Sequence, residues 1–443
     1  MKPYRWKTAM LIATTLAASG CSILKRGDGP KTPVLGNRID VLVSEVGVEV
    51  DPETAALPMS LPAPVANAEW AQSGGNASKS VGQVALGDNI AQAFAVQVGE
   101  GSEISGKLSA PPVVADGRVY TIGTQATVRA SDARTGSQVW STQFGTEKGN
   151  NDSLYGGGVA YDSGRIYATN GLGFVVALDA RNGGIIWQVR PGGPLRGSPT
   201  VVGDTLYVMS QDNQIYSLKT ADGATNWSEA AALEIAGVFG TGSPAVAQGT
   251  IVAGFSSGEL NAYRYENGRV VWQDALQRTS ISTSVSSLSD IDADPVIDRG
   301  QVFALGQGGR MVALELISGQ RMWELNIAGI STPWVAGDWV FVVTDDAKVI
   351  AIARATGKIR WITQLQRFHN ESKKRGQISY SGPVLAGGRL WLTATSGALI
   401  SVDPDKGTVL GQTDVGAPIS TPPVIADSTL YLVDDNARLH AFR

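Results

Sequence analysis

The sequence predicts an all-β fold, namely an eight-bladed β-propeller of four-stranded antiparallel blades, with the ring closed by an N-terminal strand. Three observations lead to this prediction. A unit of short strands and tight turns recurs along most of the 443 residues, a tryptophan recurs in it every 38 to 51 residues, and the last unit ends one strand short at Arg443. A repeat of roughly 40 to 50 residues is typical of propeller blades, because each small sheet needs its neighbours to bury its faces.

Each unit contains four expected strands, which are clearest between Gly164 and Trp187. There a β-branched and aromatic run, a glycine-rich turn, an apolar run, a second turn and a short strand follow one another, as in strands joined by hairpins. The tryptophan follows the second turn glycine by four residues at Trp140, Trp187, Trp227, Trp272, Trp323 and Trp361, and a seventh unit has Leu410 and Gly411 there. A further strand opening Pro-x-Val, or a close variant, is marked by Pro112, Pro199, Pro244, Pro295, Pro333, Pro383 and Pro423.

The eighth unit predicts how the ring closes. The third strands of the units begin at Val128, Val175, Ile215, Leu260, Met311, Val349, Leu399 and Leu439. The last unit lacks an outer strand, which would leave an unpaired edge. Ala93 to Gly99, with Phe94 in the tryptophan place, matches the missing strand. We expect the tryptophans to pack as wedges between blades and not to cage a flat ligand, because each stands at the same place in its unit.

The first 20 residues are predicted to be a lipoprotein signal peptide. A charged start is followed by an apolar run, Ala9 to Ala18, that is too short to span a bilayer. The junction Ala-Ser-Gly-Cys21 resembles a bacterial lipobox, and Cys21 is the only cysteine, so we expect it to be lipidated, with palmitate among the acyl groups. Ser22 is similar to the residue found in lipoproteins that are sorted to the outer membrane.

The remaining chain divides into three predicted parts. Residues 21–37 carry the lipidated cysteine and a Gly- and Pro-rich flexible tether. Residues 38–92 form an N-terminal extension or strap, and residues 93–443 form the propeller. The alternating segment Ile39 to Val50 either adds a strand to an outer blade edge or awaits a partner. We favour the first alternative, because an unprotected alternating edge invites aggregation.

Composition and the scattered polar residues exclude several functions. The formal charge is −4 and no basic stripe occurs, which argues against nucleic acid. His369 and His440 fall in different blades, and we expect His440 to be structural. Asp290, Asp292 and Asp294 have the spacing of a calcium loop but lack its glycine and final glutamate. We therefore predict no catalytic residue, metal or cofactor, and we expect the basic run Lys373-Lys374-Arg375 on a solvated loop.

The G-x-V-Y…G-x-V-x-A-L-D-A-x-x-G-x-x-x-W unit resembles the pyrroloquinoline-quinone (PQQ) type of propeller repeat. Together with the lipobox-like junction, eight units and the terminal closure, the chain resembles the lipoproteins of the outer-membrane β-barrel assembly (BAM) complex over residues 93–443. The resemblance implies a non-enzymatic scaffold on the periplasmic face of the outer membrane. The implied partners are the polypeptide-transport-associated domain of the central barrel protein BamA, other BAM subunits and nascent outer-membrane proteins.

A PQQ-dependent dehydrogenase is the alternative, since such enzymes share the repeat. They hold the quinone and a Ca²⁺ on the propeller axis and typically carry adjacent cysteines in a disulfide over the quinone. The single cysteine of this chain is used at the predicted anchor, so we favour the scaffold.

The resemblance also implies partner-contacting residues on two loops. One family motif, Leu-Ser-Asp-Val-Asp, matches Leu288 to Asp292, and the carboxylates of Asp290 and Asp292 would suit a basic partner surface. Alternatively, both aspartates cap turns before the strand at Pro295. The second family pattern, Leu-x-Leu-Arg, is placed on Ala236 to Phe239, where the arginine is absent and Val238 and Phe239 are the expected contacts.

Overall fold

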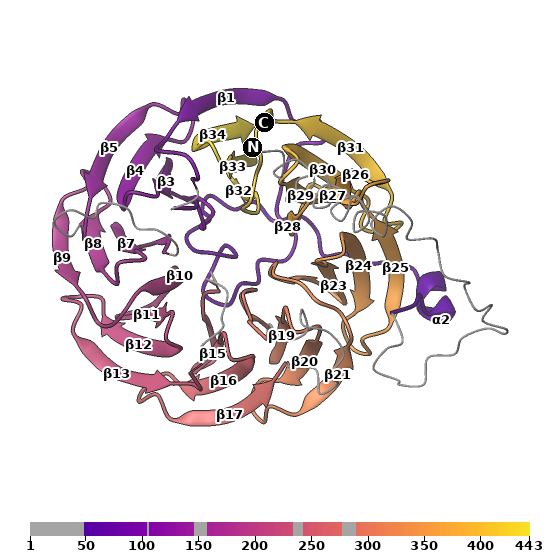
Figure 1. The fold of residues 1–443 in the computed structure, drawn as a ribbon, viewed down its shortest axis with the longest axis horizontal. Coiled ribbons are helices and arrows are strands. Elements are labelled where there is room, and N and C mark those ends of the chain that lie inside the picture. Colours follow the sequence, from indigo (N-terminus) through magenta and orange to yellow (C-terminus); the bar gives the residue numbers. More distant parts are fainter. Residues whose placement is uncertain (1–47, 104–105, 146–156, 234–241, 277–288) are drawn as a thin grey trace, which may run out of the picture. The chain divides into compact units, whose positions relative to one another are not determined.

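Eight four-stranded antiparallel sheets stand around an axis in the computed structural model, which describes residues 48–103, 106–145, 157–233, 242–276 and 289–443 (Figure 1). This confirms the predicted fold. Within each blade the strands follow one another from the axis outward. The described residues include one short helix, α2 (Pro52–Ala56), and no helix long and apolar enough to cross a bilayer.

Blades 1 to 4 consist of β2 (Val113–Ala115), β3 (Arg118–Ile122), β4 (Thr127–Asp132) and β5 (Gln138–Gln143); β6 (Val159–Asp162), β7 (Arg165–Thr169), β8 (Val175–Asp179) and β9 (Ile185–Val189); β10 (Leu195–Val202), β11 (Thr205–Ser210), β12 (Gln214–Lys219) and β13 (Thr225–Ala230); and β14 (Ala245–Ala247), β15 (Thr250–Gly254), β16 (Glu259–Arg264) and β17 (Val270–Ala275). Blades 5 and 6 consist of β18 (Val296–Asp298), β19 (Gln301–Leu305), β20 (Met311–Glu315) and β21 (Arg321–Leu325); and β22 (Trp334–Ala336), β23 (Trp339–Val343), β24 (Lys348–Ala353) and β25 (Ile359–Gln364). A separate hairpin, β26 (Phe368–Asn370) and β27 (Arg375–Gln377), precedes blade 7, which is β28 (Tyr380–Ala386), β29 (Arg389–Ala394), β30 (Ala398–Val402) and β31 (Val409–Asp414). Blade 8 is β32 (Val424–Ala426), β33 (Thr429–Val433), β34 (Arg438–Phe442) and β1 (Gln92–Gln97).

The turn between the third and fourth strands shows why the repeat keeps its Asp and Gly. In blade 2 the Asp179 carboxylate accepts from the backbone N–H of Arg181 at 2.8 Å, which holds an Asx turn. Gly183 closes the turn at φ +74° and donates its N–H to the Asp179 carbonyl at 2.8 Å. Only glycine adopts this conformation without steric cost, and the following strand then carries Trp187 toward blade 3.

The recurrent tryptophans pack between blades, as predicted. A Cβ atom added to Gly223 of blade 3 would stand 2.9 Å from the Trp187 ring of blade 2, so the glycine is also needed for this close contact. The sequence did not reveal that each indole N–H donates to a backbone carbonyl of the next blade. These bonds are Trp140 to Ala180 (3.0 Å), Trp187 to Thr220 (2.9 Å), Trp227 to Tyr265 (3.2 Å), Trp272 to Leu316 (2.7 Å), Trp323 to Arg354 (2.7 Å) and Trp361 to Pro404 (2.9 Å).

The N-terminal strand closes the ring as predicted. β1 pairs antiparallel with β34, and Phe94 lies opposite Ala441 as each tryptophan lies opposite the third strand of its own blade. The Phe94 ring packs on Gly136 of blade 1, where an added Cβ would be only 2.8 Å away. The first and last parts of the propeller sequence therefore share one blade, which removes the unpaired edge.

The N-terminal extension takes a path that the sequence did not predict. Residues 67–84, which we call the axial strap, run around the axis and bond to the innermost part of every blade (Figure 1). In chain order the bonded pairs are Asn67 with Asp427, Trp70 with Val114, Ala71 with Tyr161, Gln72 with Val201, Ala77 with Val246, Ser78 with Ile297, Gly82 with Trp334, and Val84 with Leu385 and Gly387. One segment thus contacts blades 8, 1, 2, 3, 4, 5, 6 and 7 in turn.

The axial strap is anchored by buried side chains. Trp70 is 2% exposed and stacks on Trp334 with ring centroids 6.0 Å apart. Lys79 is 1% exposed and its ammonium donates to the Thr200 hydroxyl at 3.1 Å. Burial lowers the pKa of Lys79 to about 8, although nearby Asp294 opposes this shift. The strap therefore fills this end of the axis with packed protein.

Upstream of the axial strap, the chain touches the outside of blade 6. Val50 forms a parallel bridge with Ile359, the first residue of β25, and Asp51 donates its N–H to the Ile359 carbonyl at 2.9 Å. This agrees with the predicted pairing to a blade edge at Val50 alone, because residues 39–47 lie outside the described residues. The Asp51 carboxylate then caps α2 by accepting from the Thr54 N–H at 2.8 Å.

Candidate docking site

The two ends of the blades carry different connections. The turns between the first two and the last two strands of each blade lie at one end, which we call the strap face because the axial strap bonds there. The middle turn and the connection to the next blade lie at the other end, which we call the loop face. The predicted contact residues all fall on connections between blades. The loop face is therefore the candidate docking surface, as loops on a rigid scaffold commonly carry binding residues.

The described part of the first predicted loop, Ser289 to Asp294, is firmly attached to the loop face. Ile291 is fully buried in blade 4 and donates its N–H to the Phe255 carbonyl at 3.2 Å. Asp290 accepts from the Gln307 N–H of blade 5 at 2.9 Å through its backbone carbonyl. The segment thus bridges the middle turns of blades 4 and 5.

An arginine from blade 3 holds the two predicted aspartates together. Arg196, the second residue of β10, donates from one guanidinium nitrogen to the carboxylates of Asp290 and Asp292, each at 3.2 Å, and to the Ile291 carbonyl at 3.1 Å. Both carboxylates lie on the same side, as expected for residues that alternate along an extended segment. We call Arg196, Asp290 and Asp292 the ion triad.

Burial changes the interpretation of these aspartates. The side chains of Arg196 and Asp290 are 0% and 1% exposed, and that of Asp292 is 10% exposed. The sequence suggested two carboxylates free to meet a partner, or two turn caps. The structure instead shows both carboxylates bound to Arg196. Removing both would leave the Arg196 charge buried without a partner, which is far more costly than losing an exposed charge.

The ion triad contains one more carboxylate than guanidinium. Burial, reinforced by the Asp290 carboxylate, raises the pKa of Asp292 to about 7, and Arg196 only partly opposes this shift. Burial also raises the pKa of Asp290, again against Arg196. Asp345, which adds to the negative potential at Asp292, has its own pKa raised to about 6 by burial and by Asp346. The carboxyls of Asp290, Asp292 and Asp345 therefore bind protons more readily than ordinary aspartates do.

The raised pKa of Asp292 implies that the free energy of unfolding of the protein depends on pH. Its folded-state pKa of about 7 exceeds the ordinary value of 3.8, so its protonation stabilises the folded protein below pH 4, and this contribution is lost as the pH rises through 7. The free energy of unfolding of the wild type, measured relative to Asp292→Asn by urea titration, should fall by up to about 4 kcal/mol between pH 4 and 8. A difference that stays constant over this range would contradict the assigned shift.

Asp294, the third aspartate of the run, faces the axial strap. Its carboxylate accepts from the Ser243 N–H at 2.7 Å and from the Ser73 hydroxyl at 2.6 Å. The three aspartates thus have different partners, and the described residues contain no group of three or more His, Cys, Asp or Glu side chains arranged to hold a metal ion. His440 is 3% exposed and pairs with Asp434 at 2.8 Å, as expected for a structural histidine.

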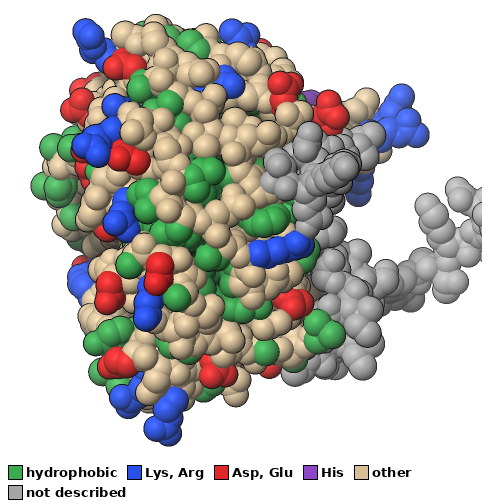
Figure 2. Space-filling model, turned by 90° about the vertical axis from the view of Figure 1, so that its left-hand side faces the viewer, with side chains coloured by type: hydrophobic (Ala, Val, Ile, Leu, Met, Phe, Trp, Pro, Cys, Tyr) green, Lys and Arg blue, Asp and Glu red, His purple; other side chains and the backbone are tan. Residues whose placement is uncertain are grey.

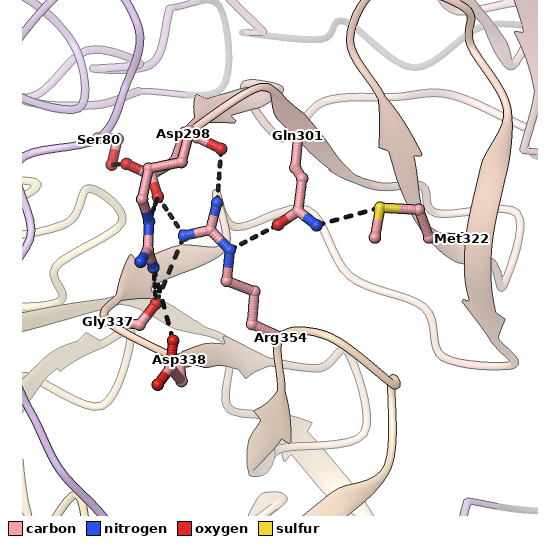
Figure 3. A network of polar contacts seen from close by, with 8 residues as sticks. Ser80, Asp298, Gln301, Met322, Gly337, Asp338 and Arg354 are labelled. Atoms are coloured by element: carbon pink, nitrogen blue, oxygen red, sulfur yellow. Dashed lines mark hydrogen bonds and ion pairs between the residues drawn. The ribbon is translucent and has the colours of Figure 1, made fainter.

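A second polar network lies on the strap face, beside a groove of about 830 Å³ between α2 and blades 5 and 6. Arg354 binds the Asp298 carboxylate and donates to Gln301, which in turn donates to the Met322 sulfur at 3.1 Å (Figure 3). The axial strap joins this network through the Ser80 hydroxyl, which donates to Asp298 at 3.0 Å. The buried cation of the groove is thus already paired, and the network fixes the strap to blade 5.

The outer surface over β5 and β9 carries side chains of both charges. Figure 2 presents this side, where Lys and Arg side chains alternate with Asp and Glu side chains and with apolar residues. Ile185 and Val139 are among the exposed apolar residues, at 51% and 45% exposure. This side has no basic stripe of the kind that binds nucleic acid.

Comparison with known proteins identifies the family. The sequence profile described as outer membrane protein assembly factor BamB matches residues 72–149, 124–363 and 366–443. The chain belongs to this family. BamB of Yersinia pestis is 27% identical over 329 residues, which cover 73% of this chain and 81% of that protein. BamB of Escherichia coli K12 is 29% identical over 365 residues, which cover 72% and 81%.

Solved structures agree on the fold. BamB of Moraxella catarrhalis superposes with a TM-score of 0.67 at 18% identity and covers 80% of this chain and 100% of its own. A quinohemoprotein alcohol dehydrogenase from Comamonas testosteroni superposes nearly as well, with a TM-score of 0.65 at 12% identity and coverage of 85% and 80%. Since the BamB structure and the dehydrogenase fit almost equally, these likenesses establish the propeller and leave function to other observations.

A second segment shares the Leu-Arg ending of the Leu-x-Leu-Arg pattern that was placed on Ala236 to Phe239. Leu288, Val238 and Phe239 lie outside the described residues, so their predicted contacts stay predictions. A Leu-Arg pair stands at Leu195 and Arg196, and the structure brings Arg196 onto Asp290 and Asp292. The repeat contains a hint of this contact, because Arg196 and Asp292 occupy equivalent positions. Each stands three residues before the proline of a first strand, Pro199 or Pro295.

Proposed function

We propose that this BamB-family chain is a non-enzymatic scaffold of the β-barrel assembly complex on the periplasmic side of the outer membrane. There it binds the polypeptide-transport-associated domain of BamA and other subunits, and aids insertion of nascent barrel proteins. The observation that carries the proposal is the family match, which spans almost the whole of the axial strap and propeller. Relatives covered over 81% of their length are named outer membrane protein assembly factors.

The structure supports a scaffold over a quinone enzyme. The residues on the axis do not suit a large planar cofactor, because the axial strap fills one end with Trp70, Lys79 and their partners. Toward the loop face, Asp290 and Asp292 are engaged by Arg196. Cys21, the single cysteine, cannot form the adjacent-cysteine disulfide expected of the dehydrogenases.

We place the BamA contact on the loop face around the ion triad. Arg196 and Asp290 are buried, so they act by fixing the loop, while Asp292, the most exposed member of the triad at 10%, is the carboxyl that a basic group of the partner can reach and hold in its charged form. Leu288, Val238 and Phe239, which lie outside the described residues, are proposed as further apolar contacts with the partner. A rigid, pre-ordered loop loses little conformational entropy on binding, which favours affinity.

Binding of the purified chain to the BamA periplasmic domains tests both function and site. The wild type should bind in isothermal titration calorimetry, and Asp292→Asn should weaken binding by about 1 to 3 kcal/mol, with a reduced salt dependence. Asp338→Asn is the matched control, because Asp338 is an 86% exposed carboxylate on the strap face. No binding by the wild type contradicts the function; unchanged binding by Asp292→Asn contradicts only the site.

The lipid anchor at Cys21 is part of the proposal, although this residue lies outside the described residues. Cys21→Ser should lose the acyl group and release the chain from the outer membrane, because a single lipid-modified N-terminus is its proposed attachment. Fractionation after labelling with a fatty acid measures this. Label retained on the serine variant would refute the assignment.

A further inference from the structure

The connection between blades 6 and 7 is a structured hairpin. The sequence suggested a solvated loop for Lys373 to Arg375, but these residues belong to the turn and second strand of a two-stranded sheet, β26 and β27, that stands apart from the blades. In the view of Figure 1, down the axis, the hairpin appears over blade 7. It belongs to the loop face, because it follows the last residue of β25 and precedes the first strand of blade 7.

Two polar side chains of the hairpin, Glu371 and Asn370, stabilise its own turn. The Glu371 carboxylate accepts from the backbone N–H of Arg367 at 2.8 Å and of Phe368 at 3.1 Å. Asn370 accepts from the Lys373 N–H at 3.0 Å through its side chain. The base is attached to blade 7 by the Tyr380 hydroxyl, which donates to the Gln366 carbonyl at 2.8 Å. The turn is therefore a defined structural feature.

The cations of the hairpin are left without partners. Within the described part of the chain, the side chains of Lys373, Lys374 and Arg375 form no ion pair or hydrogen bond, and all three residues are exposed. With Arg367, residues 366–379 carry four cations against the single carboxylate of Glu371, in a chain whose formal charge is −4. Three consecutive unpaired cations on one turn therefore give the hairpin a local positive charge on an acidic protein.

We propose that the β26–β27 hairpin is a binding element for an acidic segment of a partner polypeptide. Fixed ammonium and guanidinium groups on a pre-ordered turn recognise carboxylates without the entropy loss of ordering a loop. This contact is separate from the ion triad, whose exposed charge is negative, and it does not depend on the assembly role proposed above.

The small number of cations favours a protein over a lipid surface. Three basic residues bind an anionic membrane weakly, at about 1 kcal/mol each. The fixed turn, which the Glu371 and Asn370 side chains hold, instead presents these cations in one arrangement, as recognition of carboxylates on a polypeptide requires.

A charge-matched pair of variants tests the proposal. The hairpin variant is Lys373→Gln, Lys374→Asn and Arg375→Gln; asparagine is used because Lys374 has φ +49°, a conformation that asparagine tolerates. The control is Arg134→Gln, Lys219→Gln and Lys406→Gln, which removes three exposed cations from the strap face, two in turns and one at the end of β12. Both triple variants lose the same net charge, so long-range attraction changes equally.

The probe is a fluorescent glutamate-rich peptide, followed by anisotropy with the full chain at low ionic strength. We expect the hairpin variant to bind about fivefold more weakly or worse, as three exposed ion pairs would imply, and the control to bind within about twofold of the wild type. Carbodiimide crosslinking should join peptide carboxylates to Lys373 or Lys374 in preference to Lys219 or Lys406. Vesicles containing phosphatidylglycerol serve as the second probe.

Three outcomes would overturn the proposal. Equal loss of peptide binding in both triple variants would show general electrostatic attraction. Crosslinks spread evenly over the surface lysines would show the same. Vesicle binding that depends on the hairpin, with peptide binding unchanged, would assign it to a lipid surface. Thermal melting of the hairpin variant should match the wild type, because the turn keeps Glu371 and Asn370, so a loss of binding cannot be ascribed to unfolding.

Discussion

Replacing Arg196 by methionine should lower the free energy of unfolding by about 3 to 5 kcal/mol at pH 8. The change leaves Asp290, which is 1% exposed, and Asp292, which is 10% exposed, without their cation. Two carboxylates close together at a low-dielectric site repel each other and have lost most of their hydration. Urea titration followed by tryptophan fluorescence measures the loss, since tryptophans lie between the blades.

Two further variants identify the cause of that loss. The triple variant Arg196→Met, Asp290→Asn, Asp292→Asn should recover most of the stability, because no charge is then left unpaired. The Arg196→Met defect should also shrink at pH 5, where the carboxyls accept protons. Arg181→Met is the control, since Arg181 is 84% exposed in its pair with Asp179, and little change is expected. An Arg196→Met variant as stable as the wild type would mean that the ion triad does not stabilise the folded protein.

The propeller could be predicted because its information is local and repeated. The Asp and Gly of each outer turn fix a backbone conformation, and the tryptophan four residues later fills the space beside the next turn glycine, as at Trp187 and Gly223. The sequence of each unit therefore determines where its strands lie and how it packs against the neighbouring blade. The closing strand followed from the same pattern, with Phe94 as the substitute.

The axial strap and the ion triad could not be predicted in the same way. The strap bonds mainly through backbone groups and a few polar side chains, so its 18 residues show neither strand nor helix periodicity. Arg196 meets Asp290 across 94 positions of sequence, and only the ring geometry brings them together. Arg196 and Asp292 each stand three residues before the proline of a first strand, so the sequence places them at equivalent positions of two blades. It does not show that the two side chains meet, because that depends on the path of the connections between the blades.

The axial strap provides the other large expected effect. Trp70→Ala should lower the free energy of unfolding by about 3 to 5 kcal/mol, the usual cost of emptying a large aromatic site in a core. Trp70 is 2% exposed, stacks on Trp334 of blade 6 and exchanges backbone hydrogen bonds with Val114 of blade 1, so its loss affects two blades across the axis. Urea titration measures the change.

Two variants show whether the cost comes from packing on the axis. Trp70→Phe should cost much less than Trp70→Ala, because the Trp70 indole N–H has no hydrogen-bond partner among the described residues, so only ring volume is lost. Leu57→Ala, in the same extension but 52% exposed, should change little. If Trp70→Ala unfolds like the wild type, the strap lies on the ring without stabilising it. If the predicted order holds, the N-terminal extension is part of the core of this propeller, and each blade depends on a segment that precedes all of them in the chain.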